Sequence, residues 1–101
     1  MKILLGSPST GKTKKILELS STTGVPVLCE STARVERLIE KARGYGFSIP
    51  TPVTYDTLNP SIKEVYIDDV KRVLEGIFNV NIAGITVNRD EELEVVDLDV
   101  K

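Results

Sequence analysis

Hydrophobic residues along this chain fall into two kinds of pattern. Short apolar runs predict strands at residues 2–5, 25–29, 53–55, 65–67 and 82–87. The last stretch, residues 93–100, alternates acidic and apolar side chains, which is typical of an exposed or edge strand. Apolar residues spaced three or four positions apart predict helices, which we expect at residues 12–21, 32–43 and 70–79.

The order of these elements predicts the fold class. Strands alternate with helices, which favours an α/β protein, a three-layer sandwich around a mainly parallel sheet of about five to six strands. Only about five residues, 88–92, follow the strand at 82–87 before the last one, too few for a parallel crossover. We therefore expect the last strand to pair antiparallel with an edge strand or to leave the sheet. No repeat or linker interrupts the chain, so residues 1–101 are expected to form a single domain.

One motif carries specific chemistry. Gly6-Ser7-Pro8-Ser9-Thr10-Gly11-Lys12-Thr13 matches G-x-x-x-x-G-K-[ST] at every fixed position, between a predicted strand and a predicted helix. The two glycines let the backbone curl so that N–H groups and the helix N-terminus can surround phosphate oxygens. We expect Lys12 to neutralise the β- and γ-phosphates of a nucleotide and the Thr13 hydroxyl to bind Mg²⁺. The alternative interpretation is an ordinary turn between strand and helix.

Two carboxylates follow the apolar run at residues 65–67. Asp68, at the carboxyl end of this predicted strand, would reach the Mg²⁺ shell as a Walker B acid does. The alternative is that Asp68 or Asp69 caps the next helix, and Asp68 can do both.

These motifs resemble those of the P-loop NTPase superfamily, and more narrowly its helicase- and terminase-like ATPases of the small phage type. The resemblance implies a RecA-like core. It extends to residues 54–58, which look like the short motif before the Walker B strand, and to residues 31–34, which fall where those ATPases contact nucleic acid. Residues 85–88 look like the strand whose last polar residue senses the γ-phosphate. The resemblance thus implies that Asn88 senses the γ-phosphate. Those ATPases usually carry Glu after the Walker B Asp, where it polarises the attacking water, whereas here Asp69 takes that place with a shorter carboxylate.

Two further residues bear on catalysis. Glu30, at the end of the second predicted strand, is a rival general base to Asp69. The second core domain that carries an arginine finger in those families is not expected here, so Arg89 is a candidate finger acting on another subunit. The alternative is a charged turn at residues 89–92.

Composition and charge narrow the chemistry. The chain has 101 residues, with 13 basic and 15 acidic side chains, no histidine and one cysteine. This excludes a disulfide scaffold and a histidine general base. Residues 1–43 carry a net charge of +4 and residues 44–101 carry −6, so the first part favours a polyanionic ligand. Arg34, Arg37 and Lys41 form a basic stripe that would contact a DNA backbone, and the alternative is a solvated helix face.

These observations lead to one functional expectation and two alternatives. We expect Mg²⁺-dependent binding and slow hydrolysis of ATP or another nucleoside triphosphate, in phage DNA metabolism or packaging, with a homo-oligomer or protein partner needed for full activity. The alternatives are a non-hydrolysing, nucleotide-binding regulatory or assembly module and, more weakly, a nucleotide kinase. The N-terminal apolar stretch covers only residues 3–5, so we expect a cytoplasmic protein, in a host cell if it is a phage protein, without a membrane partner.

Overall fold

The computed structural model describes residues 1–100 and divides into two compact units. The first unit combines Met1–Lys12 with the chain from Ala83 onward, and the second unit is Thr13–Ile82. The ends of the chain therefore belong to one unit, and the middle of the chain forms the other.

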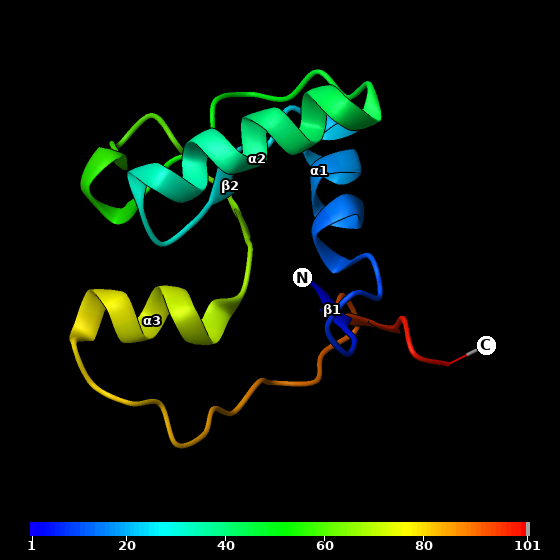
Figure 1. Ribbon diagram of the computed structural model, residues 1–101. Helices are drawn as coiled ribbons and strands as arrows, with labels where there is room; N and C mark the ends of the chain where they lie inside the picture. Colours follow the sequence, from blue (N-terminus) through cyan, green and yellow to red (C-terminus); the bar gives the residue numbers. More distant parts are fainter. Residues whose placement is uncertain (101) are drawn as a thin grey trace. The chain divides into compact units, whose positions relative to one another are not determined.

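The first unit is built on a pair of parallel strands. β1 (Lys2–Leu5) pairs with β4 (Glu94–Asp97), and Leu5 lies opposite Asp97. The blue and red strands of Figure 1 show this pairing between the two ends of the chain. Because the strands run in the same direction, the residues that follow each of them leave the sheet at the same edge.

The second unit holds the helices and a second pair of parallel strands. Its elements are α1 (Lys12–Thr23, which begins at the unit boundary), β2 (Val27–Leu28), α2 (Thr32–Tyr45), the 3₁₀ helix η1 (Tyr55–Thr57), β3 (Tyr66–Ile67) and α3 (Val70–Phe78). β2 pairs with β3, and Val53 adds an isolated parallel bridge to Leu28 on the other side of β2.

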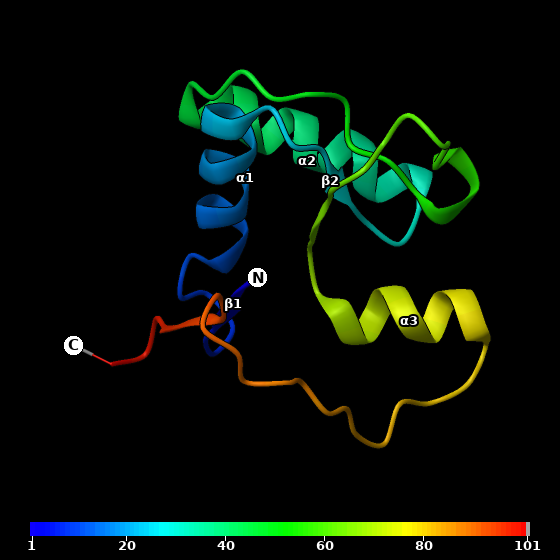
Figure 2. The ribbon, with the colours of Figure 1, turned by 180° about the vertical axis from the view of Figure 1, so that it is seen from behind.

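The core of the second unit lies where α1, β2 and α2 meet, and both ribbon views show these elements next to one another (Figures 1 and 2). Five buried residues form it: Leu17, Val27, Cys29, Leu38 and Ala42. Burying a side chain the size of leucine or valine contributes about 1.5–3 kcal/mol, so each large member of this cluster stabilises the unit by an amount of this order.

The ends of α2 follow local sequence signals. The Ser31 hydroxyl accepts a hydrogen bond from the Arg34 amide at 3.2 Å, which caps the N-terminus. Gly46 adopts a left-handed conformation with φ of 78° and ends the helix, as glycine commonly does. The helix predicted at residues 32–43 is thus confirmed and extends by two residues.

The predicted fold class is wrong. In place of a three-layer RecA-like sandwich with five to six strands, residues 1–100 contain two separate two-stranded parallel sheets and three α-helices. Two of the predicted strands do not form. The run at 53–55 gives only the bridge at Val53, since Pro50 and Pro52 lack amide donors and η1 begins at Tyr55.

The second missing strand, residues 82–87, explains a further error. Ala83–Val87 is exposed and has no strand partner among residues 1–100. With no strand there, the connection from α3 to β4 runs from Asn79 to Leu93, which is long enough for β4 to return parallel to β1. Both alternatives predicted for the last strand, antiparallel pairing with an edge strand and departure from the sheet, are therefore wrong.

Within residues 1–100, each helix is too short or too polar to cross a membrane.

Candidate functional site

The loop at residues 6–11 joins β1 to α1, as the motif predicts. Its backbone takes left-handed φ values at Ser9 (68°) and Gly11 (88°). Alternation between right- and left-handed residues is the conformation from which anion-binding amide nests are built. A Cβ atom at Gly6 would collide with Oγ1 of Thr10, so a larger residue here would displace the Thr10 hydroxyl from its hydrogen bond to the Ser7 carbonyl.

Lys12 is held against its own loop. Its Nζ donates hydrogen bonds to the carbonyl oxygens of Gly6 and Ser7, both at 2.7 Å. The Thr10 hydroxyl also donates to the Ser7 carbonyl at 2.7 Å, which tightens the same turn. The ammonium group thus donates hydrogen bonds to neutral carbonyl oxygens and makes no direct ion pair within residues 1–100, so its charge acts on anions close to the loop.

A carboxylate from the end of the chain already binds this loop. Asp99 accepts hydrogen bonds from the Ser7 amide, at 3.2 Å to Oδ1 and 3.0 Å to Oδ2, and from the Ser7 hydroxyl at 2.8 Å. The hydroxyl contact, then the amide contact, and the positive charge of Lys12 lower the pKa of Asp99. The loop thus binds one anionic group within the chain itself.

Asp99 is one of several acids near the end of the chain, and no sequence signal distinguishes it from the others. The register of β1 and β4 explains the contact. Leu5 lies opposite Asp97, so Ser7 and Asp99 occupy equivalent positions two residues farther along. The pairing of the two ends of the chain was not predicted, so the contact could not be predicted either.

In the second unit, the structure brings together Thr13, Asp68 and Arg34. The Thr13 hydroxyl, in the first turn of α1, donates to Oδ1 of Asp68 at 3.4 Å. Arg34 of α2 donates to Oδ2 of Asp68 from Nε at 3.1 Å and from Nη2 at 2.8 Å. The Asp68 side chain is 8% exposed and that of Arg34 is 17% exposed, so this is a largely buried ion pair.

Asp68 owes its position to the parallel pairing of β2 and β3. Its amide donates to the Leu28 carbonyl at 3.2 Å, which continues the ladder by one residue beyond β3. The carboxylate therefore lies at the carboxyl end of the strand, as the sequence predicted.

Thr13 and Asp68 offer the hard oxygen ligands that Mg²⁺ prefers. No group of three or more potential His, Cys, Asp or Glu ligands exists within residues 1–100. A site of this kind fits Mg²⁺ bound together with a nucleotide, because Mg²⁺ is commonly held by one or two protein groups, substrate phosphates and water. Thr13 and Asp68 thus offer two oxygen ligands of the kind that suits Mg²⁺, and phosphate and water would have to complete its shell.

The two candidate general bases share one arginine. Asp69, with φ of 60°, is the N-cap of α3 and accepts a hydrogen bond from the Arg72 amide at 3.3 Å. Its carboxylate also lies 3.7 Å from Nε of Arg72, and Glu30 lies 3.4 Å from Nη1 of the same arginine. The helix-cap interpretation of Asp69 therefore describes what this side chain does in the structure.

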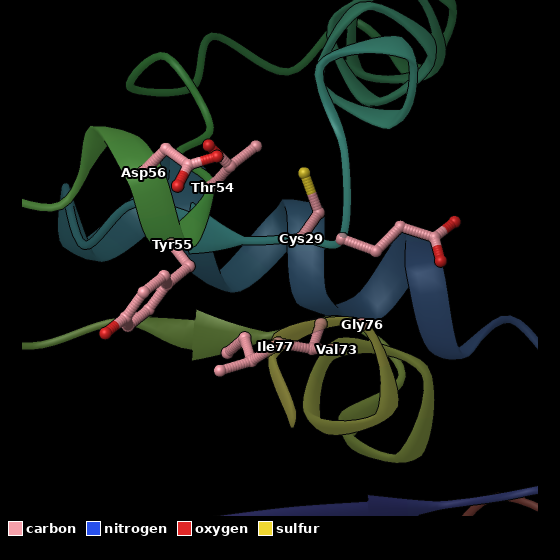
Figure 3. A pocket seen from close by; sticks show the side chains of 8 residues that line it. Cys29, Thr54, Tyr55, Asp56, Val73, Gly76 and Ile77 are labelled. Carbon is pink, nitrogen blue, oxygen red and sulfur yellow. The ribbon is translucent and has the colours of Figure 1, made fainter. Parts of the chain in front are cut away.

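Glu30 also lines a pocket of about 280 Å³ in the second unit, with Cys29, Thr54, Asp56, Val73 and Ile77 among the other lining residues (Figure 3). Burial, the main effect, raises the pKa of the Cys29 thiol, so this group stays protonated at neutral pH. Asp68 does not line this pocket.

The other predicted residues do not join these clusters. Asn88 and Arg89 lie in an exposed segment of the first unit without regular secondary structure. The predicted basic stripe is divided, because Arg34 turns inward to Asp68 whereas Arg37 and Lys41 are exposed on α2.

Comparison with protein-family models, with curated proteins and with solved structures gave no match to this chain.

Proposed function

We propose that this protein binds a Mg²⁺–nucleoside triphosphate complex, with ATP as the expected nucleotide, and hydrolyses it slowly. The observation that carries the proposal is the contact between the Thr13 hydroxyl and the buried Asp68 carboxylate. Thr13 ends a complete phosphate-loop motif, and Asp68 ends a strand far away in the sequence. A hydroxyl and a carboxylate in these two places are what Mg²⁺–nucleotide binding requires.

Each part of the proposed site has a defined task. The loop amides and the N-terminus of α1 hold phosphate oxygens, and Lys12 exchanges its contacts with the Gly6 and Ser7 carbonyls for contacts with phosphate. Thr13 and Asp68 hold the metal. When bound, Mg²⁺ offsets the negative charge that develops on the phosphate oxygens.

Hydrolysis also requires a carboxylate that orients the attacking water. Asp69 and Glu30 are the two candidates, and both are paired with Arg72, so either must share or release this arginine to act as a base. An arginine supplied by a partner or by another copy, with Arg89 as the candidate in this chain, would add about 10³–10⁵ in rate. We therefore propose that the isolated chain hydrolyses slowly.

A second candidate function is a nucleotide-binding regulatory or assembly module that does not hydrolyse its ligand. The observation that favours it is the role of Asp69, which caps α3 and pairs with Arg72 at the position where the resembling ATPases usually carry a glutamate that polarises water.

Phosphate release distinguishes the two functions. We expect slow, Mg²⁺-dependent release by the wild type, loss of release in Lys12→Ala, and wild-type release in Lys14→Ala, an exposed lysine on the same helix. Equal rates in the wild type and Lys12→Ala would refute hydrolysis at this site. Tight binding of ATP without any release would establish the regulatory module instead.

A further inference from the structure

The Asp68 carboxylate has its charge balanced inside the protein. Arg34 directs two donors, Nε and Nη2, to the single oxygen Oδ2, while Oδ1 faces the Thr13 hydroxyl. A buried carboxylate is stable only when it is paired and hydrogen-bonded, and Arg34 meets both needs without any metal.

Two further acids belong to this region, Glu30 and Asp69, and they share one arginine, Arg72. Glu30, the nearby acid that also affects the Cys29 thiol, is itself paired with Arg72 at 3.4 Å. Cys29 is neutral because burial raises its pKa. The Asp68–Arg34 pair is therefore neutral in itself, and the one negative charge that remains beside it belongs to the more exposed Glu30 and Asp69.

We propose that Arg34 is the internal counter-ion of Asp68 and acts against binding of a divalent cation on its own, so that the metal enters together with the nucleotide. This inference rests on the proposed function, because it takes Asp68 as the metal carboxylate. A bare divalent cation approaching Oδ1 meets a carboxylate whose charge the guanidinium already offsets. The nucleotide phosphates supply the missing negative charge. Arg34 then acts as a positioning residue, because it binds only Oδ2 of Asp68 and so keeps Oδ1 directed at Thr13.

A purely structural role for Arg34 predicts the opposite direction. If the guanidinium only oriented Asp68, its removal would weaken metal binding or leave it unchanged. If Arg34 opposes the metal, its removal strengthens binding of the metal alone. The sign of the change thus separates the two roles.

The test uses Mn²⁺ as a spectroscopic substitute for Mg²⁺ and follows the free ion by electron paramagnetic resonance, without nucleotide. We expect weak binding to the wild type and binding at least about tenfold tighter to Arg34→Gln. The matched control, Arg37→Gln, changes an exposed arginine one turn away on α2 and should bind like the wild type. The double variant Arg34→Gln/Asp68→Asn should lose the gain.

Repeating the titration with a non-hydrolysable ATP analogue separates the possible failures. Suppose that Mn²⁺ binds the wild type in the presence of the analogue, but that Arg34→Gln binds Mn²⁺ no more tightly than the wild type when the analogue is absent. The counter-ion role is then refuted and the proposed function stands. If Mn²⁺ binds no variant with or without the analogue, both are refuted.

A measurement on the wild type covers the case in which Arg34→Gln does not fold. The Nε–H signal of Arg34 in nuclear magnetic resonance reports its hydrogen bond to Asp68. We expect this signal to shift and to exchange faster with water when Mg²⁺ and the ATP analogue are added together, and to stay unchanged with Mg²⁺ alone. An unchanged signal after joint addition, or the full shift with Mg²⁺ alone, would overturn the inference.

Discussion

The Thr13 hydroxyl lies 3.4 Å from Oδ1 of Asp68, although 55 positions separate the two residues in the chain. Thr13 is the last residue of the phosphate-loop motif and lies in the first turn of α1, and Asp68 follows β3. Their contact places the hydroxyl that ends the motif beside the carboxylate that follows β3, within the second unit. It is the geometric basis for placing the metal of the proposed nucleotide complex at this point.

Replacing Asp68 tests this cluster. We expect Asp68→Asn to remove the Mg²⁺-dependent part of the affinity for an ATP analogue, measured by calorimetry with Mg²⁺ and with a chelator. It should also lower the free energy of unfolding in urea, because Arg34 loses its buried partner; the loss of one partner costs about 3–5 kcal/mol when a pair is fully buried. In Arg34→Gln/Asp68→Asn, part of the stability should return while the metal dependence stays absent. Mg²⁺-dependent binding by Asp68→Asn would contradict the assignment.

Two substitutions of Asp69 distinguish its structural role as a helix cap from a catalytic role as the general base. Asp69→Ala removes the N-cap of α3 and should cost about 0.5–2 kcal/mol of stability. Asp69→Asn keeps a capping side chain that tolerates the left-handed conformation, so its stability should stay near that of the wild type. If Asp69 is the general base, Asp69→Asn loses phosphate release while it remains folded. If release is unchanged in Asp69→Asn, Asp69 is a cap only and Glu30 becomes the base to test.

The contact between Asp99 and Ser7 should make the free energy of unfolding depend on pH. Because hydrogen bonds lower the pKa of Asp99 in the folded state, its ionised form stabilises the fold above the pKa of the unfolded chain, about 3.9. This contribution is lost as the pH falls through the lower, folded-state pKa. Thermal unfolding followed at several pH values should show a steeper loss below about pH 4 in the wild type than in Asp99→Asn. Identical pH dependence in the two proteins would mean that the contact does not stabilise the fold.

The same carboxylate bears on ligand affinity. Asp99 holds a negative charge on the loop that is proposed to bind phosphates. We expect Asp99→Asn to bind the ATP analogue severalfold more tightly, since it removes a like charge. Glu91→Gln, which neutralises an exposed acid in the same unit, is the matched control and should bind like the wild type. Weaker binding by Asp99→Asn would show that the carboxylate supports the loop rather than competing with the ligand.

The sequence predicted those features that depend on neighbouring residues. The apolar spacing predicted the helix at residues 32–43, which forms as α2, and the motif at residues 6–13 lies between a strand and a helix as expected. Asp68 also lies at the end of its predicted strand. Each of these features depends on a few neighbouring residues, so the local sequence is sufficient to predict it.

Pairing between distant segments could not be predicted in this way. The run at residues 82–87 has the composition of a strand but no partner within residues 1–100, and β4 pairs with β1 rather than with an antiparallel edge. For the same reason, the Ser7–Asp99 contact and the ion pair of Arg34 with Asp68 could not be predicted. In the sequence, Arg34 is one of three basic residues on a helix face. These features depend on which segments meet, and hydrophobic periodicity does not specify this.

The central claim is that the loop at residues 6–13 binds a nucleotide, and calorimetric titration with a non-hydrolysable ATP analogue and Mg²⁺ tests it most directly. We predict a saturable binding isotherm for the wild type and for Lys14→Ala, and an affinity at least about tenfold lower for Lys12→Ala, which lacks the ammonium group that should bind the phosphates. Absence of binding by the wild type at millimolar concentrations, or equal affinity in Lys12→Ala, would contradict the account.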